Sequence, residues 1–537
     1  IFAQEYVKQY FKDMLAFLPP VRTLNPTEAL AQLDLSTSCG PFVPGKKSDY
    51  VTYSNGEITY DSGSLFGLHV QNILAIAGAG HPIENAYKLG LKDELLPKEK
   101  VLVKKRLIWG TDCGLAFLAQ IVWGDLFTKI KMTNSIGPCA VGCNPHSSFT
   151  VAIADRMIDK STLCLDYSKW DSTMNPLVIH QAVDILCDLA EPSPFNDSLR
   201  ATLKQRPLGY FMDKVVEAQR GLPSGMPGTS ILNSICHCIL FVSGLWLAQD
   251  DAGIGREIDP LKDNQIVTYG DDCIYGFSKR NYPIMAGFVR AMRTLGLKPT
   301  SPSKDDNFRR DGKIVFLKRD WNVIDVPNGP RLIVAQLDLD SILRQAVWIR
   351  GNNGGVHTYP KEPTDSRAVQ IQEALMELAV HGREVFDQWR DLFIATAHAE
   401  GYSIQADWDH LIQIYVQRWT VGDFGTNTAY AHLLGGQLQS PDPPQNSAPS
   451  SEGGMGSGPA NPENATGLVT GSYTATPAVV GAAGASEPAS GPLATMGAGL
   501  QTGVPPQLMG LWVCSTKFSW NSQQPNNAML GSLALSP

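Results

Sequence analysis

Four aspartates in two short segments have the chemistry and the spacing to bind divalent cations. In "VTYGDDCIYG" (267–276) Asp271 and Asp272 are adjacent, and in "TLCLDYSKWDST" (162–173) Asp171 follows Asp166 by five positions. Adjacent carboxylates repel each other, and carboxylate oxygens are the ligands that Mg²⁺ takes together with substrate phosphates. Two such ions about 4 Å apart can hold the attacking and leaving oxygens of a phosphoryl transfer. The alternative is that both segments are ordinary solvated turns.

The flanking residues predict strands that bring these aspartates together. Residues 266–269 and 273–275 favour two β-strands, and Gly270 beside Asp271 is typical of a hairpin turn, because glycine tolerates a positive φ. Residues 162–165 predict a short strand that ends at Asp166, ahead of a helix in "NPLVIHQAVDILCDLA". We therefore expect Asp166 at a strand end, next to Asp271 on a neighbouring turn.

A third segment, "GLPSGMPGTSILNS" (221–234), combines a loop rich in glycine and proline with the start of a long apolar helix. Its glycines allow the backbone to approach a ligand closely. Thr229 and Asn233 are four positions apart and share one helical face, and a polar stripe on a buried helix needs hydrogen-bond partners. The hydroxyls of a nucleotide sugar would serve. An ordinary turn followed by a capped helix would show the same pattern.

The composition is that of a soluble globular protein, with 537 residues of which 43% are hydrophobic and 18% charged. A net charge of −8 argues against a wholly basic nucleic-acid-binding protein, but not against a local basic channel. Ten scattered cysteines without a signal peptide predict reduced thiols in the cytosol. The apolar run at 231–248 is long enough to span a membrane, but Asn233, Ser234 and His237 within it favour a buried core helix.

The composition changes sharply after Glu452. Between residues 453 and 537 the only charged residues are Glu463, Glu487 and Lys517. This part is rich in glycine, alanine, proline, serine and threonine, and such a composition cannot fill a core of its own. We therefore expect one folded body up to about residue 440 and a linker or arm after it.

Taken in chain order, the segments at 162–173, 221–234 and 267–276 resemble the palm motifs A, B and C of the RNA-dependent RNA polymerases of positive-strand viruses. In their amino-acid sequences they resemble the calicivirus enzymes in particular. Four more segments resemble motifs G, F, D and E of this family: "TSCGPFVPGKK" (37–47), "KDELLPKEKVLVKKRLIWG" (92–110), "LGLKPTSPSKD" (295–305) and "FLKRDW" (316–321). The resemblance covers about residues 1–440. It implies an α/β right-hand fold, with an α+β palm, fingers and a helical thumb.

By this resemblance the chain divides into fingers at 1–157, a palm at 158–325 with a fingers insertion at about 175–215, and a thumb at 326–440. Apolar residues at helical spacing fit two thumb helices: Ile371, Leu375 and Leu378 in one, and Val385, Trp389, Leu392 and Phe393 in the other. The N-terminal segment that bridges fingers to thumb in this family is expected to be mostly missing.

The stretch "FSWNSQQPNNAMLGSLALSP" (518–537) resembles the end of a capsid N-terminal arm where the shell domain begins, and in sapoviruses and some other caliciviruses the polymerase and the capsid share one reading frame. A linker at 441–454 would precede the capsid N-terminal arm and the start of its shell domain at 455–537. Met455 would begin the capsid protein. The viral protease would cut at Glu452–Gly453, with Gln437 and Gln439 as competing sites.

The resemblance also implies the roles of individual residues. Asp166 and Asp271 would be the main ligands of two Mg²⁺ or Mn²⁺ ions, with Asp272 as a supporting carboxylate. Lys304 would donate a proton to pyrophosphate, with Lys298 as its rival. The ribose 2′-OH, which separates RNA precursors from DNA precursors, would be recognised by Asp171, Ser224, Gly225, Thr229 and Asn233. A basic cluster of motif F would neutralise the triphosphate, unless it is a solvated charged face: Lys92, Lys104, Lys105 and Arg106.

The implied function is RNA-directed RNA polymerisation in the replication and transcription of a positive-strand RNA virus genome. The implied partners are an RNA template, a primer or protein-linked primer (VPg), NTPs, the viral protease, capsid subunits for the C-terminal part and further copies of the chain in a homo-oligomer. No transmembrane segment is expected. The expected location is the host cell cytoplasm, in membrane-associated replication complexes, with the capsid part in the virion.

The sequence also allows two alternative functions and one alternative site. A reverse transcriptase would carry a bulky aromatic residue in place of Asp171, so Asp171 and Asn233 favour ribonucleotides. A structural precursor with an inert polymerase part would not bind both Mn²⁺ and NTP. "CAVGCNPH" offers zinc ligands in Cys139, Cys143 and His146, but the spacing is loose and no fourth ligand is nearby, so a plain finger loop is favoured.

Overall fold

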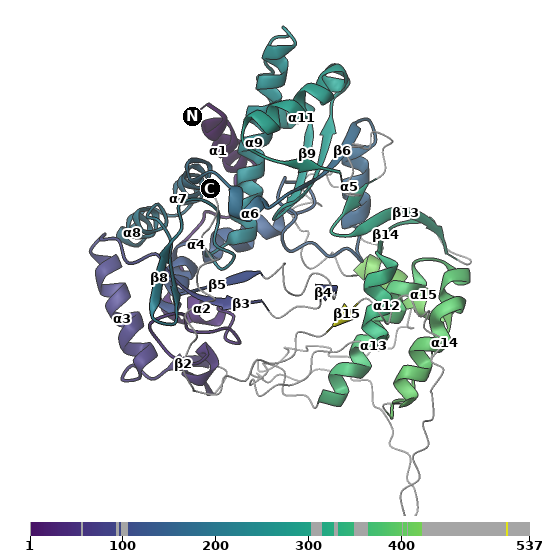
Figure 1. The fold of residues 1–537 in the computed structure, drawn as a ribbon, viewed down its shortest axis with the longest axis horizontal. Helices are drawn as coiled ribbons and strands as arrows, with labels where there is room; N and C mark the ends of the chain where they lie inside the picture. Colours follow the sequence, from purple (N-terminus) through teal and green to yellow (C-terminus); the bar gives the residue numbers. More distant parts are fainter. Residues whose placement is uncertain are drawn as a thin grey trace, which may run out of the picture. The chain divides into compact units, whose positions relative to one another are not determined.

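The computed structural model describes residues 2–54, 57–92, 96–97, 106–301, 314–326, 331–347, 363–399, 401–404, 406–421 and 512–513. The chain forms two units, one of Ile1–Gly436 with Val504–Pro537 and one of Gln437–Gly503. All described helices and strands belong to the first unit (Figure 1).

A four-stranded antiparallel sheet carries the residues of motifs A, C and D. Its order is β11 (Pro299–Thr300), β6 (Ser161–Tyr167), β10 (Asp272–Phe277) and β9 (Gln265–Tyr269). The central strands are buried along most of their length, which explains why their sequences read as apolar runs rather than as alternating patterns. The predicted hairpin is confirmed, because β9 and β10 pair directly on either side of Gly270 and Asp271.

Helices cover this sheet and form one hydrophobic core with it. Helix α9 (Thr229–Asp251) packs against β9, against α11 (Met285–Thr294) and against α7 (Pro176–Leu189), the helix predicted after motif A. Helices α4 (Cys113–Met132) and α9 are long and apolar enough to cross a membrane, but 78% and 83% of their apolar windows are buried inside the protein. Both are therefore packed as core helices, as the polar residues within α9 predicted.

A second four-stranded sheet joins residues that are more than a hundred positions apart. Its order is β5 (Leu107–Thr111), β3 (Ala86–Leu91), β7 (Leu208–Phe211) and β8 (Lys214–Glu217), with β3 and β7 parallel. Strand β5 leads directly into α4 through Asp112, whose carboxylate accepts the backbone N–H groups of Gly114 and Leu115 and so caps the helix.

The remaining elements of residues 2–301 surround these two sheets. They are α1 (Phe2–Leu15), α2 (Pro26–Ala31), η1 (Lys47–Asp49), β1 (Val51–Ser54), β2 (Glu57–Tyr60), α3 (Leu65–Gly78), α5 (Phe149–Met157), α6 (Trp170–Thr173), α8 (Pro194–Leu203), α10 (Pro260–Asp263) and η3 (Lys279–Ile284). The first of them, α1, buries Val7 and Phe11 against α7 and α9.

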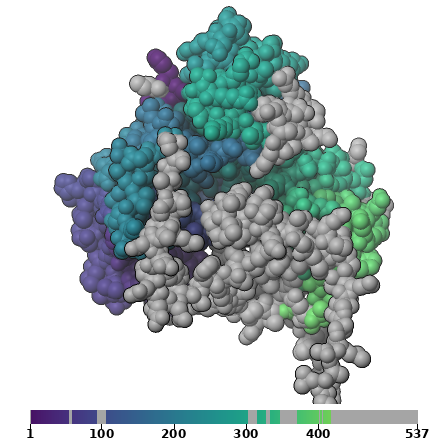
Figure 2. Space-filling view, in the orientation of Figure 1, coloured from purple at the N-terminus to yellow at the C-terminus, as the bar shows by residue number. Residues whose placement is uncertain are grey.

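The residues after motif D form a three-stranded sheet and four helices. The strands are β12 (Val315–Phe316), β13 (Arg319–Asp325) and β14 (Arg331–Leu337), and the helices are α12 (Leu339–Val347), α13 (Pro363–Ala379), α14 (Arg383–Ala399) and α15 (Trp408–Val421). Helices α13 to α15 are the green part of Figure 2. The two predicted helices are confirmed, since the apolar residues at helical spacing lie in or against one hydrophobic core: Ile371, Leu375, Leu378, Val385, Trp389, Leu392 and Phe393.

A buried ion pair ties the helical part to the sheet that precedes it. Arg319 on β13 donates to both oxygens of Glu377 on α13, at 2.8 and 2.6 Å, and a ring nitrogen of His146 lies 2.9 Å from the same carboxylate. Burial acts to raise the pKa of Glu377, but the hydrogen bonds from Arg319 and His146 outweigh it and lower the pKa to about 2. Glu377 therefore stays charged and holds three separate segments together.

Residues near the end of the chain pair with the segment assigned to motif F. The short strand β15 (Trp512–Val513) lies antiparallel to β4 (Leu96–Pro97), with Trp512 opposite Pro97 and Val513 opposite Leu96. The predicted cleavage site, the linker at 441–454 and the rest of the predicted capsid segment lie outside the described residues.

Truncation after Glu452 tests whether this pairing matters to the folded body. Because two paired residues bury little surface, we expect the truncated chain to keep the thermal midpoint and the RNA synthesis of the full chain. The comparison uses thermal melts and primer extension on both forms. A large loss in either would show that the tail is part of the polymerase fold.

Replacing Glu377 by Gln should destabilise the protein strongly. Arg319 would keep a buried charge without its counter-ion, a change that costs about 3 kcal/mol in the free energy of unfolding. The control is Asp250→Asn, because the ion pair of Asp250 with Arg256 is solvent-exposed and contributes little. Thermal melts of the two variants should differ clearly, and equal melting would contradict the assigned importance of the Arg319–Glu377 pair.

Candidate active site

The strand register sets the predicted metal-binding aspartates side by side. In β6 and β10, Leu165 lies opposite Cys273, and the same register carried one residue further sets Asp166 opposite Asp272. Residues directly opposite each other in an antiparallel pair have Cβ atoms about 5 Å apart. Asp166 lies within β6 rather than after it, because Thr300 of β11 pairs with it from the other side.

The turn between β9 and β10 presents Asp271 at the same end of the sheet. Tyr269 and Asp272 are the last paired residues, so Gly270 and Asp271 form a two-residue turn. Gly270 has a φ of 67°, which meets the need of a type II′ turn for glycine at its first central position. Asp271 is exposed, whereas Asp272 and Asp166 are half-buried.

Electrostatic interactions confirm that these carboxylates form one cluster. Burial and, after it, the charges of Asp271 and Asp166 together raise the pKa of Asp272 to about 6, against the opposing effect of Lys318. Partial desolvation also raises the pKa of Asp171, with Asp271 as the second cause, although much of the Asp171 residue is exposed to solvent. Asp271 therefore acts on both Asp272 and Asp171, and Asp166 acts on Asp272.

The structure brings together two of the five predicted ribose-recognising residues. The side-chain amide of Asn233, which is buried on α9, donates to a carboxylate oxygen of Asp171 at 3.1 Å. Asp171 lies on the short helix α6, which begins after Lys169 in a left-handed conformation with φ of 56°. The backbone N–H of Leu222 donates to the carbonyl of Asp171 at 2.7 Å, so the loop before α9 rests on α6.

The other three predicted residues make contacts within the fingers and the loop. The hydroxyl of Ser224 accepts the backbone N–H of Trp109 at 3.1 Å, and a Cβ on Gly225 would lie 1.9 Å from the carbonyl oxygen of Trp109. Thr229 donates its hydroxyl to the carbonyl of Met226. These three residues therefore fix the loop against β5 and at the head of α9, and their predicted contact with a sugar stays a prediction.

Two cations face the carboxylate cluster, and one of them was missed by sequence reasoning. Arg106, a member of the predicted basic cluster, lies close enough to lower the pKa of Asp171, against the effect of burial. Lys318, which lies in the segment assigned to motif E, does the same for Asp272. Lys318 has a φ of 58° in the tight turn before β13, and nothing in its local sequence signalled this placement.

The remaining predicted basic residues are only partly described. Lys92 is exposed, and its backbone N–H donates to the carbonyl of Arg106 at 2.9 Å. Lys298 is exposed, and its carbonyl accepts the backbone N–H of Ser168 at 3.0 Å. Three predicted residues lie outside the described part of the chain: Lys104, Lys105 and Lys304.

The donor set of the aspartate cluster fits hard divalent cations. Carboxylate oxygens are the ligands of Mg²⁺ and Mn²⁺, and like charges that raise the pKa of Asp272 are relieved by a bound cation. Among the described residues, one group of three metal-capable side chains has its ligand atoms within 4.8 Å of one another, and it is a different one: His69, Asp112 and Cys113. The aspartates at the end of β6 and β10 are not such a group among the described residues.

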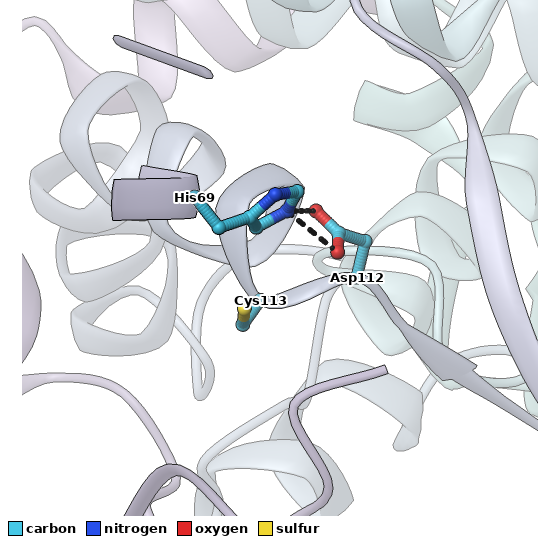
Figure 3. A group of neighbouring side chains, drawn as sticks. All are labelled: His69, Asp112 and Cys113. Atoms are coloured by element: carbon cyan, nitrogen blue, oxygen red, sulfur yellow. Dashed lines mark hydrogen bonds and ion pairs between the residues drawn. The ribbon is translucent and has the colours of Figure 1, made fainter. Parts of the chain in front are cut away.

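The group of His69, Asp112 and Cys113 is a structural feature of the helix start. A ring nitrogen of His69 points at both carboxylate oxygens of Asp112, 3.0 Å from each (Figure 3). The same carboxylate caps α4, so its oxygens already have partners. The predicted finger loop with Cys139, Cys143 and His146 is not such a group among the described residues, since His146 contacts Glu377 instead.

Removing the charge of Asp272 should stabilise the metal-free protein at neutral pH. The folded-state pKa of about 6 lies above the unfolded value of 3.8, so the contribution of this group is most favourable at low pH and is lost as the pH rises through 6. In EDTA at pH 7.5, Asp272→Asn should therefore melt above the parent, and the difference should shrink towards pH 5.

The control for this experiment is Asp251→Asn, at the exposed end of α9, which should not alter the melt at either pH. A lower melting temperature for Asp272→Asn in EDTA at pH 7.5 would contradict the repulsion inferred from the structure.

Comparisons with known proteins agree with this geometry. Residues 2–397 match the family described as viral RNA-dependent RNA polymerase. Over 403 residues the chain is 35% identical to the genome polyprotein of bovine enteric calicivirus Newbury agent-1, an alignment that covers 71% of this chain and 18% of the polyprotein. Over 388 residues it is 33% identical to the genome polyprotein of canine calicivirus strain 48, covering 71% and 20%. The chain thus spans about a fifth of the length of these curated relatives.

A solved structure shows the same fold. The Sicinivirus 3Dpol RNA dependent RNA polymerase superposes with a TM-score of 0.61 at 22% sequence identity, covering 77% of this chain and 84% of that one. The predicted α/β right-hand polymerase fold is therefore confirmed. With the family match over most of its length, the chain belongs to the viral RNA-dependent RNA polymerases.

Proposed function

We propose that the chain joins ribonucleotides on an RNA template by a two-metal mechanism that uses Asp166 and Asp271 as the main ligands. The observation that carries this proposal is the carboxylate cluster at the end of β6 and β10, next to the contact between Asn233 and Asp171. Acidic groups for cations and a polar pair for a sugar thus lie at one end of one sheet.

The side chains around the cluster have complementary tasks in this mechanism. Two bound Mg²⁺ or Mn²⁺ ions would stabilise the attacking and the leaving oxygens of the phosphoryl transfer. Asp166, Asp271 and Asp272 supply the oxygen ligands. Arg106 and Lys318 add positive charge on the two sides of the cluster, where the triphosphate of the incoming nucleotide carries negative charge.

The Asp171–Asn233 pair would select the sugar. Asn233 presents N–H groups and Asp171 presents oxygens, and a 2′-OH is both a donor and an acceptor, so one hydroxyl can contact both residues. A deoxyribonucleotide would leave these polar groups unpaired, which is the usual physical basis for rejecting a substrate that lacks a hydroxyl.

We propose the wider biology from the calicivirus likeness. The partners would be the RNA template, a primer or protein-linked primer (VPg), NTPs and further copies of the chain, in membrane-associated complexes of the host cytoplasm. The segment at 455–537 would be the start of a capsid protein, and this protein would become part of the virion. A viral protease would release it at Glu452–Gly453.

The metal assignment is tested by Asp166→Asn and Asp271→Asn. Each change removes an anionic oxygen from the proposed metal site, so nucleotide incorporation should fall by several orders of magnitude, as expected when several kcal/mol of transition-state stabilisation are lost. Primer extension with Mg²⁺ and with Mn²⁺ measures the rate, and thermal melts check the fold. The exposed Asp251→Asn is the control. Extension by Asp271→Asn within tenfold of the parent would refute the assignment.

A further inference from the structure

We propose that Trp170 is a positioning residue for sugar selection, because its indole N–H fixes the direction of the Asn233 side-chain amide. The proposal rests on the proposed function, in which Asn233 and Asp171 recognise the ribose. It adds a residue that touches neither the sugar nor the metals and acts through Asn233.

The direction of the amide follows from the chemistry of its two neighbours. The indole Nε1 of Trp170 donates to Oδ1 of Asn233 at 2.9 Å, and Nδ2 of Asn233 donates to Asp171 at 3.1 Å. An indole N–H can only donate, and an ionised carboxylate can only accept. The amide oxygen must therefore face Trp170, and the amide nitrogen must face Asp171. Two adjacent residues of α6 thus hold the two ends of one amide.

The indole itself is fixed in the core. Trp170 is 2% exposed, and its ring stacks on that of His237 with a centroid distance of 3.9 Å and an interplanar angle of 10°. The ring of Tyr167 packs against the ring of Trp170, with a distance of 4.8 Å between the ring centroids. Because the indole cannot leave this position without disrupting both contacts, its N–H stays aimed at Asn233.

A buried hydrogen-bond chain supports the stack. A ring nitrogen of His237 lies 3.1 Å from the hydroxyl of Tyr275, which in turn lies 3.0 Å from the hydroxyl of Tyr167. Burial lowers the pKa of His237 to about 3, so its ring is neutral. His237 follows Asn233 by one helical turn on α9 and Tyr275 lies on β10, so the network connects motifs A, B and C.

Loss of the indole donor would remove the constraint on the amide. Asn233 would then keep only its contact with Asp171, and its buried amide oxygen would lose its donor, so the amide could tilt or shift and its N–H group would no longer be held in place for the 2′-OH. This change would weaken the use of ribonucleotides, because only they carry the hydroxyl. The use of deoxyribonucleotides would be largely unaffected.

The direct test is Trp170→Phe, which keeps an aromatic ring against His237 and removes the N–H. We expect the ratio of the incorporation efficiencies (kcat/KM) for an NTP and its dNTP to fall roughly tenfold, as for the loss of about one hydrogen bond. We expect kcat/KM for the NTP to fall, whereas kcat/KM for the dNTP should stay within about twofold of the parental value. A general packing defect would lower both efficiencies together.

The matched control is Trp123→Phe. Trp123 is also fully buried, but its indole nitrogen has no hydrogen-bond partner among the residues that the structure describes. This change removes a similar volume without removing a contact to the site. The NTP-to-dNTP ratio should stay at the parental value, and a fall equal to that of Trp170→Phe would overturn the proposal.

A double-mutant cycle with Asn233→Ala separates this proposal from the proposed function. Asn233→Ala alone should lower the NTP-to-dNTP ratio, and Trp170→Phe should lower it no further in that background. A full additional effect of Trp170→Phe would overturn the proposal. The proposal would also be overturned if Asn233→Ala lowers the NTP-to-dNTP ratio but Trp170→Phe leaves it unchanged. The proposed function would stand in that case. An unchanged ratio in Asn233→Ala would instead refute ribose recognition by the pair.

A second variant guards against misfolding of Trp170→Phe. Replacing Trp170 with 3-benzothienylalanine puts sulfur in place of the N–H and keeps the size and stacking of the ring. If Trp170→Phe melts well below the parent, the ratio is measured on this variant. The same roughly tenfold fall is expected, and a parental ratio would overturn the proposal.

Discussion

The mutual repulsion of closely spaced carboxylates is the constraint on which the rest of the site depends. Asp166 and Asp272 lie opposite each other on paired strands, and Asp271 occupies the adjoining turn. Flexible segments would separate like charges, so this arrangement requires a rigid support. The paired central strands, the core helix α9 and the opposing charges of Arg106 and Lys318 supply it. The raised pKa of Asp272 is the consequence of holding these carboxylates close together in a partly buried place.

The buried helix α9 carries polar side chains next to this carboxylate cluster, and these side chains need hydrogen-bond partners. Asn233 and His237 lie inside the core, where an unpaired polar group is costly. Each side chain is held by partners from motif A or motif C, so the helix, the strand and the turn cannot shift independently. The contacts that hold these buried side chains also orient the amide of Asn233 towards Asp171.

Local sequence patterns were enough to predict the hairpin at Gly270, the strand that leads to Asp166, the buried helix α9 and the helices α13 and α14. Each of these elements depends on nearby residues and on a simple periodicity. Contacts made over long distances were not predictable in this way. Lys318 reaches Asp272 only because β12 and β13 fold back, and the hydroxyl of Ser224 is engaged by the backbone of Trp109. The role of Asp112 as a helix cap likewise depends on where β5 ends.

The close approach of the motif B loop to β5 limits how this enzyme can vary. At Gly225 even a methyl group would overlap the backbone of Trp109, and backbone atoms cannot be trimmed by mutation elsewhere. Every replacement at this position would push β5 away from the loop that precedes α9. Any substitution at Gly225 therefore requires the loop or β5 to move, so this position tolerates little change as long as the joint between loop and strand is kept.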